Sequence, residues 1–157
     1  VNGFMVGKDS EWGGIAKDGA KMVNAVSNSV VPKISLLIGG SYGAGNYAMS
    51  GRAYEPRFMY SWPSAKLAVM GGEQAAKTLM QIKLSKMSNI NDSEKDKIYK
   101  QIKLNYDKQT KAEYGAARMW VDEIIDPGNT REVLIRSLEI ISNQSVLPEP
   151  RFSVFQC

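Results

Sequence analysis

The feature that most constrains this chain is a glycine-rich stretch at residues 39–49, GGSYGAGNYAM. The apolar run Ile34–Ile38 comes just before it and predicts a short buried strand, and the small residues from Ala44 to Met49 favour a helix. A strand that passes through glycines into a helix directs free backbone N–H groups at whatever lies before the helix. These groups can stabilise an oxygen that gains negative charge. The glycines can also serve only a tight turn and close helix packing, so both interpretations stay open.

The same pattern of strand, glycines and helix occurs a second time. The run Lys66–Met70 predicts a short strand, and Gly71 and Gly72 follow it. Glu73 then supplies the acidic residue that is favourable in the first turn of a helix. The sequence therefore predicts two places where backbone amides face a ligand. Close packing remains the alternative explanation for this second pair of glycines.

Strands and helices alternate along the rest of the chain, with no internal repeat and no linker that would divide it into two domains. The expected strands are 1–7, 33–38, 57–62, 66–70 and 120–126, and the expected helices are 15–29, 44–49, 73–86, 92–108, 110–119 and one from 129 or 130 onward. A strand, a helix and a further strand in this order favour a parallel sheet with crossover connections. At 157 residues the chain is long enough for one α/β domain with its own core.

Side-chain types predict further local details. Residues 8–14 are expected to be a loop, Asp92 or Ser93 to cap the helix that follows, and Thr110–Glu113 to form a capping box. Residues 144–157 are expected to be an extended tail. The face of the last helix that is predicted to point inward consists of Val133, Leu134, Leu138, Ile140 and Ile141.

The amino-acid composition removes several kinds of chemistry. The chain contains no histidine, which excludes Ser-His triads, histidine bases and histidine-ligated zinc. Its single cysteine, Cys157, allows neither an intrachain disulfide nor a thiolate metal cluster. No apolar run approaches the roughly 20 residues of a membrane span. Any chemistry in this chain must therefore use carboxylates, hydroxyls, lysines or backbone amides.

The net charge of +4 is concentrated in one region. Residues 77–111 contain nine lysines against four acidic residues, and leucines and isoleucines separate the lysines at helical spacing. This pattern favours a solvated amphipathic surface. A nucleic-acid-binding module is the alternative, but only Tyr99 and Tyr106 interleave with the lysines as stacking aromatics.

Seven segments together, and in this order, resemble one known family. They are 3–7 (GFMVG), 13–21 (GGIAKDGAK), 31–33 (VPK), 39–49, 62–63 (WP), 69–76 (VMGGEQAA) and 116–122 (AARMWVD). The resemblance is to the C-terminal domain of the carboxyltransferase (β) subunits of biotin-dependent acyl-CoA carboxylases. The central glycine motif resembles the methylcrotonoyl-CoA carboxylase form more than the propionyl-CoA form, and Phe152–Phe155 is similar to the end of the methylcrotonoyl enzymes.

The resemblance implies a crotonase-like (ClpP/crotonase) α/β fold of repeated strand–strand–helix units. Residues 1–157 would be a C-terminal carboxyltransferase domain fragment that is incomplete at its N-terminus. The implied reaction moves the carboxyl group of carboxybiotin to 3-methylcrotonoyl-CoA. Geranyl-CoA or propionyl-CoA remain alternative acyl groups, and a non-catalytic scaffold that kept the fold is the alternative from another class.

The resemblance also implies roles for particular residues. The backbone N–H groups of Ala44 and Gly45 match the family's oxyanion hole for biotin. Further contacts to biotin or to the acyl group are implied for Gly43, Tyr47, Gly71 and Gly72. Tyr47 is equally explained as a tyrosine packed on the helix, and Phe4 and Trp62 are expected in the core. No metal is expected.

Partners and location follow from the resemblance alone. Biotin would be carried by a biotin carboxyl carrier or biotin carboxylase α subunit, and acyl-CoA would be the substrate. The missing N-terminal domain, which holds the thioester's own amide pair, and other β subunits would complete a homo-oligomer, so the fragment alone should be inactive. No nucleic-acid or membrane partner is expected. The location would be the mitochondrial matrix in a eukaryote or the cytoplasm in a bacterium.

Overall fold

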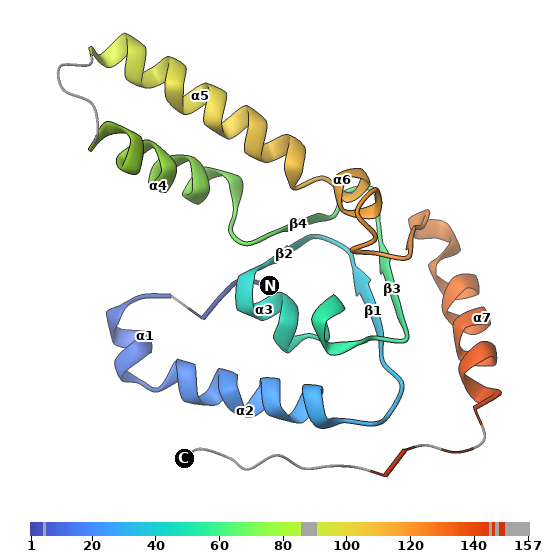
Figure 1. The fold of residues 1–157 in the computed structure, drawn as a ribbon. Coiled ribbons are helices and arrows are strands. Elements are labelled where there is room, and N and C mark those ends of the chain that lie inside the picture. The colour runs from blue at the N-terminus through green and yellow to red at the C-terminus, as the bar shows by residue number, and fades with distance from the viewer. Residues whose placement is uncertain (5, 86–90, 145, 147, 150–157) are drawn as a thin grey trace.

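The computed structural model describes residues 1–4, 6–85, 91–144, 146, 148 and 149. Five short strands form two parallel sheets (Figure 1). One sheet has the order β1 (Ile34–Leu37), β3 (Phe58–Ser61) and β5 (Glu123–Ile124), and the other pairs β2 (Gly40–Tyr42) with β4 (Lys66–Ala68). In the described residues these strands pair with one another in parallel, as the alternation of strands and helices predicts.

The strand–strand–helix repeat is present in the chain. The first unit is β1, β2 and α3 (Gly43–Ala48), and the second is β3, β4 and α4 (Gly72–Leu84). In each unit the first strand joins the three-stranded sheet and the second strand joins the two-stranded sheet. The strands of the first unit therefore pair with those of the second. Ser35 lies beside Met59 in one sheet, and Ser41 lies beside Leu67 in the other. The predicted α/β class is confirmed.

Helices cover the two sheets and extend beyond them (Figure 1). The remaining helices are α1 (Lys8–Trp12), α2 (Ile15–Asn28), α5 (Asp92–Gln109), α6 (Ala112–Ala116) and α7 (Thr130–Ser142), with short 3-10 helices η1 (Arg52–Tyr54) and η2 (Pro127–Asn129). The small residues of α2 allow close packing, because the Phe4 ring lies against buried Gly19. Phe4 therefore packs on α2, although it is half-buried rather than part of the buried core.

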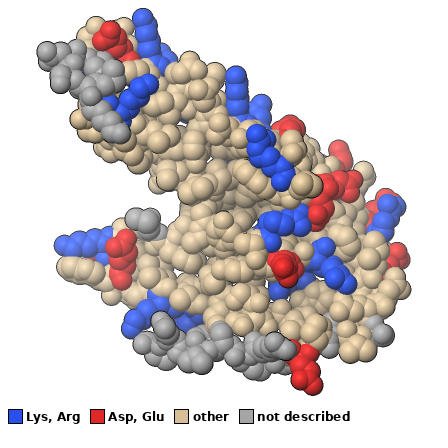
Figure 2. Space-filling model, in the orientation of Figure 1, with Lys and Arg blue, Asp and Glu red and all other residues tan. Residues whose placement is uncertain are grey.

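Helices α4 and α5 pack against each other and project away from the sheets as one hairpin (Figure 1). Its lysines are mostly exposed, and on the face that Figure 2 shows they are spread along the hairpin rather than gathered in one patch. Two ion pairs within the helices, Lys77–Glu73 and Lys95–Asp92, neutralise part of the charge. The lysines thus form the solvated face that their spacing predicts.

Buried side chains lie on both faces of the three-stranded sheet. Met59 is 1% exposed on the face toward α3, whereas the Tyr60 hydroxyl on the α7 side lies 2.7 Å from Oγ of fully buried Ser137. The indole N–H of Trp62 donates to Thr130 Oγ1 over 3.0 Å. These contacts hold α7 on β3 and confirm a structural role for Trp62.

Several local expectations are wrong. The described part of residues 1–7 forms no strand, although Val1 makes two backbone hydrogen bonds to β2. The expected loop at 8–14 contains α1, with Lys8 over the Trp12 ring at 4.3 Å. In the final helix Leu138 and Ile140 are 57% and 50% exposed.

The expected helix caps are also wrong. Asn91, rather than Asp92 or Ser93, caps α5 by a capping box with Glu94. The Thr110 hydroxyl donates backward to a carbonyl of α5 instead of capping α6. Since Asn, Asp and Ser are all good caps, the choice among adjacent candidates depends on the path of the incoming chain.

Some expectations fall partly or wholly outside the described residues. These are the tail at 144–157, Phe152–Phe155 and Cys157. In the part of the chain that the structure describes, no helix combines the length and the hydrophobicity that a bilayer crossing requires.

Candidate functional site

The two glycine turns begin at the same end of the two-stranded sheet. Strands β2 and β4 run parallel with Tyr42 beside Ala68, so their carboxyl ends meet at one edge. Helix α3 begins there at Gly43, whose φ of +57° favours glycine. A Cβ atom at Gly43 would lie 3.0 Å from the carbonyl oxygen of Val69, which follows β4. Pairing of the strands thus brings the central motif against the second turn.

The first turn of α3 carries the two amides that the sequence indicates. Ala44 is half-buried, and Gly45 is buried beneath the main chain of Asn2. A Cβ atom at Gly45 would clash with the Asn2 carbonyl oxygen and would lie 3.0 Å from its carbon. The N–H groups of a first helical turn have no acceptor within the helix, and no side chain caps α3. Its first turn also lacks an acidic residue, so the donors keep their affinity for an anion.

The second glycine turn has a different electrostatic environment. Glu73 lies in the first turn of α4, and the hydrogen bond and charge of Lys77 hold the pKa of Glu73 below its ordinary value. The Asp107 carboxylate also lies against Gly72, where a Cβ atom would meet it. Two carboxylates at this helix start already occupy the favourable position for negative charge. The first turn of α3 therefore opposes a negative charge less than the first turn of α4 does.

Gly71 and Gly72 differ in what surrounds them. Gly72 has packing neighbours on α5, Asp107 and Tyr106, and the Tyr106 hydroxyl accepts a hydrogen bond of 3.4 Å from Met70 N–H. A Cβ atom at Gly71 would meet nothing within 4 Å. Packing thus explains Gly72, whereas Gly71 has free space beside it.

Tyr47 lies on the outer part of α3. It is 47% exposed, and its ring meets the Tyr54 ring edge-on at a centroid distance of 6.1 Å. Such aromatic pairs orient both rings. Tyr47 is therefore packed on η1 and also keeps half of its surface available for contact.

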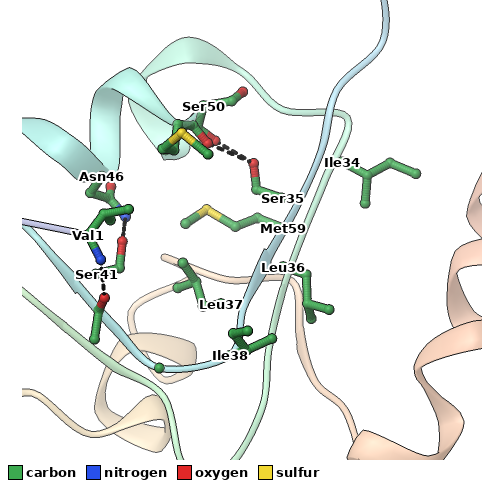
Figure 3. A pocket seen from close by; sticks show the side chains of 14 residues that line it. Val1, Ile34, Ser35, Leu36, Leu37, Ile38, Ser41, Asn46, Ser50 and Met59 are labelled. Atoms are coloured by element: carbon green, nitrogen blue, oxygen red, sulfur yellow. Dashed lines mark hydrogen bonds between the residues drawn. The ribbon is translucent and has the colours of Figure 1, made fainter. Parts of the chain in front are cut away.

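Sequence reasoning missed two features near this site. The Asn46 amide donates a 2.8 Å hydrogen bond to Ser41 Oγ (Figure 3). A cavity of about 240 Å³ opens between β1 and the second half of α3, and Asn46, Met49 and Met59 are among its lining residues. Ala44 and Gly45 do not line it. The cavity is lined by segments far apart in the sequence, and the Asn46–Ser41 hydrogen bond, although it spans only five residues, depends on the geometry of the turn, so periodicity carries no signal for either feature.

Among the described residues, no group of three His, Cys, Asp or Glu side chains is placed to hold an ion. The chemistry available at the start of α3 is that of backbone N–H donors.

The sequence matches the carboxyl transferase domain family over residues 1–155. This chain belongs to that family. It is 48% identical to the methylcrotonoyl-CoA carboxylase beta chain of Dictyostelium discoideum, over 99% of the chain and 27% of that protein. It is 46% identical to a biotin-dependent 3-methylcrotonyl-coenzyme A carboxylase beta1 subunit of Mycobacterium tuberculosis, over 99% of the chain and 30% of that protein.

Solved carboxyltransferase structures have the same fold. The beta subunit of Pseudomonas aeruginosa geranyl-CoA carboxylase superimposes with a TM-score of 0.82 at 41% identity, over 99% of this chain and 29% of that subunit. Transcarboxylase 12S, described as a hexamer assembly, gives a TM-score of 0.82 at 34% identity over the same shares of the two chains. The crotonase-like fold expected from the sequence agrees with these neighbours. The chain spans less than a third of the length of these relatives.

Proposed function

We propose that this chain is the C-terminal part of the carboxyltransferase subunit of a biotin-dependent acyl-CoA carboxylase. It would take part in transfer of a carboxyl group from carboxybiotin to 3-methylcrotonoyl-CoA. The observation that carries the proposal is the uncapped first turn of α3, in a chain nearly half identical to methylcrotonoyl-CoA carboxylase beta chains. Residues 1–157 would then be a C-terminal carboxyltransferase domain, with 144–157 as its tail.

The residues at the start of α3 have the hydrogen-bond donors that biotin carried by another subunit would need. The ureido group of biotin supplies the carboxyl group and becomes electron-rich at oxygen as the group leaves. Ala44 and Gly45 would donate their backbone N–H groups to that oxygen, and removal of one such donor costs about 3 kcal/mol of transition-state stabilisation in other enzymes. Ala44 is only half-buried, and no carboxylate in the first turn of α3 opposes an oxyanion. The donor set therefore fits the group.

The remaining contacts complete the proposal. Gly43 sets the turn, Gly71 has free space beside it for the biotin or acyl group, and Gly72 would stand next to that space. The partners would be a biotin-carrying α subunit, an N-terminal domain and other β subunits. A eukaryotic protein would reside in the mitochondrial matrix, as the names of its eukaryotic relatives suggest, and a bacterial one in the cytoplasm.

The test compares two substitutions in the same glycine motif. The chain is co-expressed with a carboxyltransferase N-terminal region and the biotin-carrying subunit, and carboxyl transfer to methylcrotonoyl-CoA is measured. Ala44→Pro deletes one donor without breaking an intrahelical hydrogen bond, because Ala44 is the second residue of α3. Gly39→Ala is the matched control, since a Cβ atom there meets nothing within 4 Å.

We expect Ala44→Pro to abolish transfer while assembly persists, and Gly39→Ala to remain active. An assembled wild-type complex that transfers carboxyl to no acyl-CoA would overturn the enzyme proposal in favour of a scaffold. Full activity of assembled Ala44→Pro would overturn the donor role alone.

Geranyl-CoA is the second candidate substrate, because a geranyl-CoA carboxylase subunit shares this fold at 41% identity. Tyr47 would border the acyl group in either case. A panel of methylcrotonoyl-, geranyl- and propionyl-CoA decides between them by their relative kcat/KM values, which measure transition-state binding.

A further inference from the structure

The side-chain amide of Asn46 joins the two ends of the central glycine turn. Its Nδ2 donates to Ser41 Oγ over 2.8 Å, and Ser41 is 3% exposed on β2 (Figure 3). The hydrogen bond therefore connects the strand before the turn to the helix after it. Gly43, Ala44 and Gly45 lie within the loop that this bond closes.

This turn needs an external restraint. Helix α3 has only six residues and no side-chain cap, and helices of that length are unstable by themselves. Gly43 at its start has a φ of +57° and carries no side chain that could fix the turn by packing. The angle between α3 and β2 is thus set by contacts outside the helix, and the Ser41–Asn46 hydrogen bond is a local contact that spans the turn.

The Asn46 side chain packs against Gly51 on its other side, in the space that a side chain at residue 51 would need. A Cβ atom at Gly51 would clash with Asn46 Oδ1 and would lie 2.8 Å from the Asn46 carbonyl oxygen. Gly51 has a φ of −67°, which every residue adopts, so space and not backbone conformation accounts for a glycine there. The amide is therefore confined between Ser41 and Gly51.

We infer that Asn46 is a positioning residue for carboxyl transfer. It holds the first turn of α3 so that the Ala44 and Gly45 N–H groups meet the developing oxyanion. This inference rests on the proposed function. Because misplacement of reacting groups by about 1 Å can cost about 100-fold in rate, we expect Asn46→Ala to lower kcat by roughly 10- to 100-fold. The KM for acyl-CoA should stay unchanged, since the amide does not belong to the proposed acyl site.

The experiment uses the complete carboxyltransferase subunit assembled with its biotin-carrying subunit. The variants are Asn46→Ala, Ser41→Ala and the double substitution, with kcat, KM and Tm measured for each. Asn105→Ala is the matched control, because it removes an exposed amide hydrogen bond of 3.3 Å from Gln101 on α5. Ser41→Ala deletes a single oxygen atom and keeps the test valid if Asn46→Ala fails to fold.

We expect each single variant to lose kcat with KM nearly constant and Tm lowered by only a few degrees, since one partly buried hydrogen bond is lost. The double variant should lose no more kcat than Asn46→Ala, because both substitutions remove the same hydrogen bond. Three results would overturn the inference. The first is a kcat that falls only as much as the fraction of folded protein falls, and the second is an unchanged kcat. The third is a double variant whose loss of kcat is the product of the two single losses. If the wild-type assembly transfers no carboxyl group, the proposed function fails, and amide hydrogen exchange decides whether the bond restrains the turn. Faster exchange confined to residues 42–49 in Asn46→Ala supports the restraint, and unchanged exchange refutes it.

Discussion

The substitution Gly45→Ala should change the geometry of the first turn of α3 with little effect on the stability of the domain. The added Cβ atom would collide with the carbonyl oxygen of Asn2, and the Asn2 carbon and nitrogen lie only 3.0 and 3.2 Å from its position. The obstacle is main chain and not the movable end of a side chain. Either α3 or the segment at Asn2 must therefore move, by a distance on the order of 1 Å, to restore ordinary packing.

The expected effect on stability is small because two contributions oppose each other. Overpacking costs about 1–3 kcal/mol, whereas alanine in place of glycine within a helix recovers about 1 kcal/mol. We expect the free energy of unfolding to fall by about 0–2 kcal/mol. The transfer rate should fall much further, by about 100-fold, because a 1 Å displacement of the donors spoils their alignment with the oxyanion.

The assay pairs urea unfolding of the chain with carboxyl transfer by the assembled carboxylase. Gly39→Ala is again the control, since its Cβ atom enters open space and Gly39 is not among the described glycines with positive φ. Wild-type transfer by an assembled Gly45→Ala variant would show that the alignment of this turn does not limit the reaction. Loss of transfer by Gly39→Ala as well would show that the whole motif, and not its first helical turn, is sensitive.

Three further predictions concern the surrounding structure. Ser137→Ala leaves a buried tyrosine hydroxyl without its partner and should lower the free energy of unfolding by about 1–3 kcal/mol in urea; no loss would mean that water replaces the serine. Gly72→Ala should cost less than about 1 kcal/mol, because the Asp107 carboxylate can rotate away, and a larger cost would show that Asp107 is fixed. The Glu73 carboxyl should titrate below its ordinary pKa of 4.5 because of Lys77, and Lys77→Gln should raise its pKa toward 4.5 in an NMR titration. Since the folded-state pKa of Glu73 is lowered, its contribution to stability is present above pH 4.5 and disappears as the pH falls through that lowered value.

Most elements of the fold can be predicted from local sequence. Strands β1, β3 and β4 and the helices α2, α3, α4 and α5 lie where apolar spacing and small residues indicate them, whereas β2 lies inside the glycine-rich stretch and is not predicted. The errors have identifiable causes. In the described part of residues 1–7, only Val1 forms hydrogen bonds with β2, and no strand results. Whether a segment becomes a strand depends on the strand beside it as much as on its own sequence. In α7, buried Ser137 rather than Leu138 faces the sheet, because the Tyr60 hydroxyl lies there and offers a hydrogen bond.

The candidate site also combines features that the local sequence predicts with features that it does not. The sequence by itself determined that a glycine turn leads into a helix at Ala44 and Gly45, because small residues, backbone freedom and the unpaired N–H groups of a first turn are local properties. Only the tertiary structure decided that Asn2 covers Gly45, that Val69 borders Gly43 and that Asn46 reaches Ser41. It also placed the Asp107 carboxylate at the second turn, where it opposes a further negative charge. The contact of Val69 with Gly43 depends on the register of β2 with β4, and the contact of Asp107 with Gly72 depends on the approach of α5 to α4. Long-range packing of this kind leaves no periodic trace in the sequence.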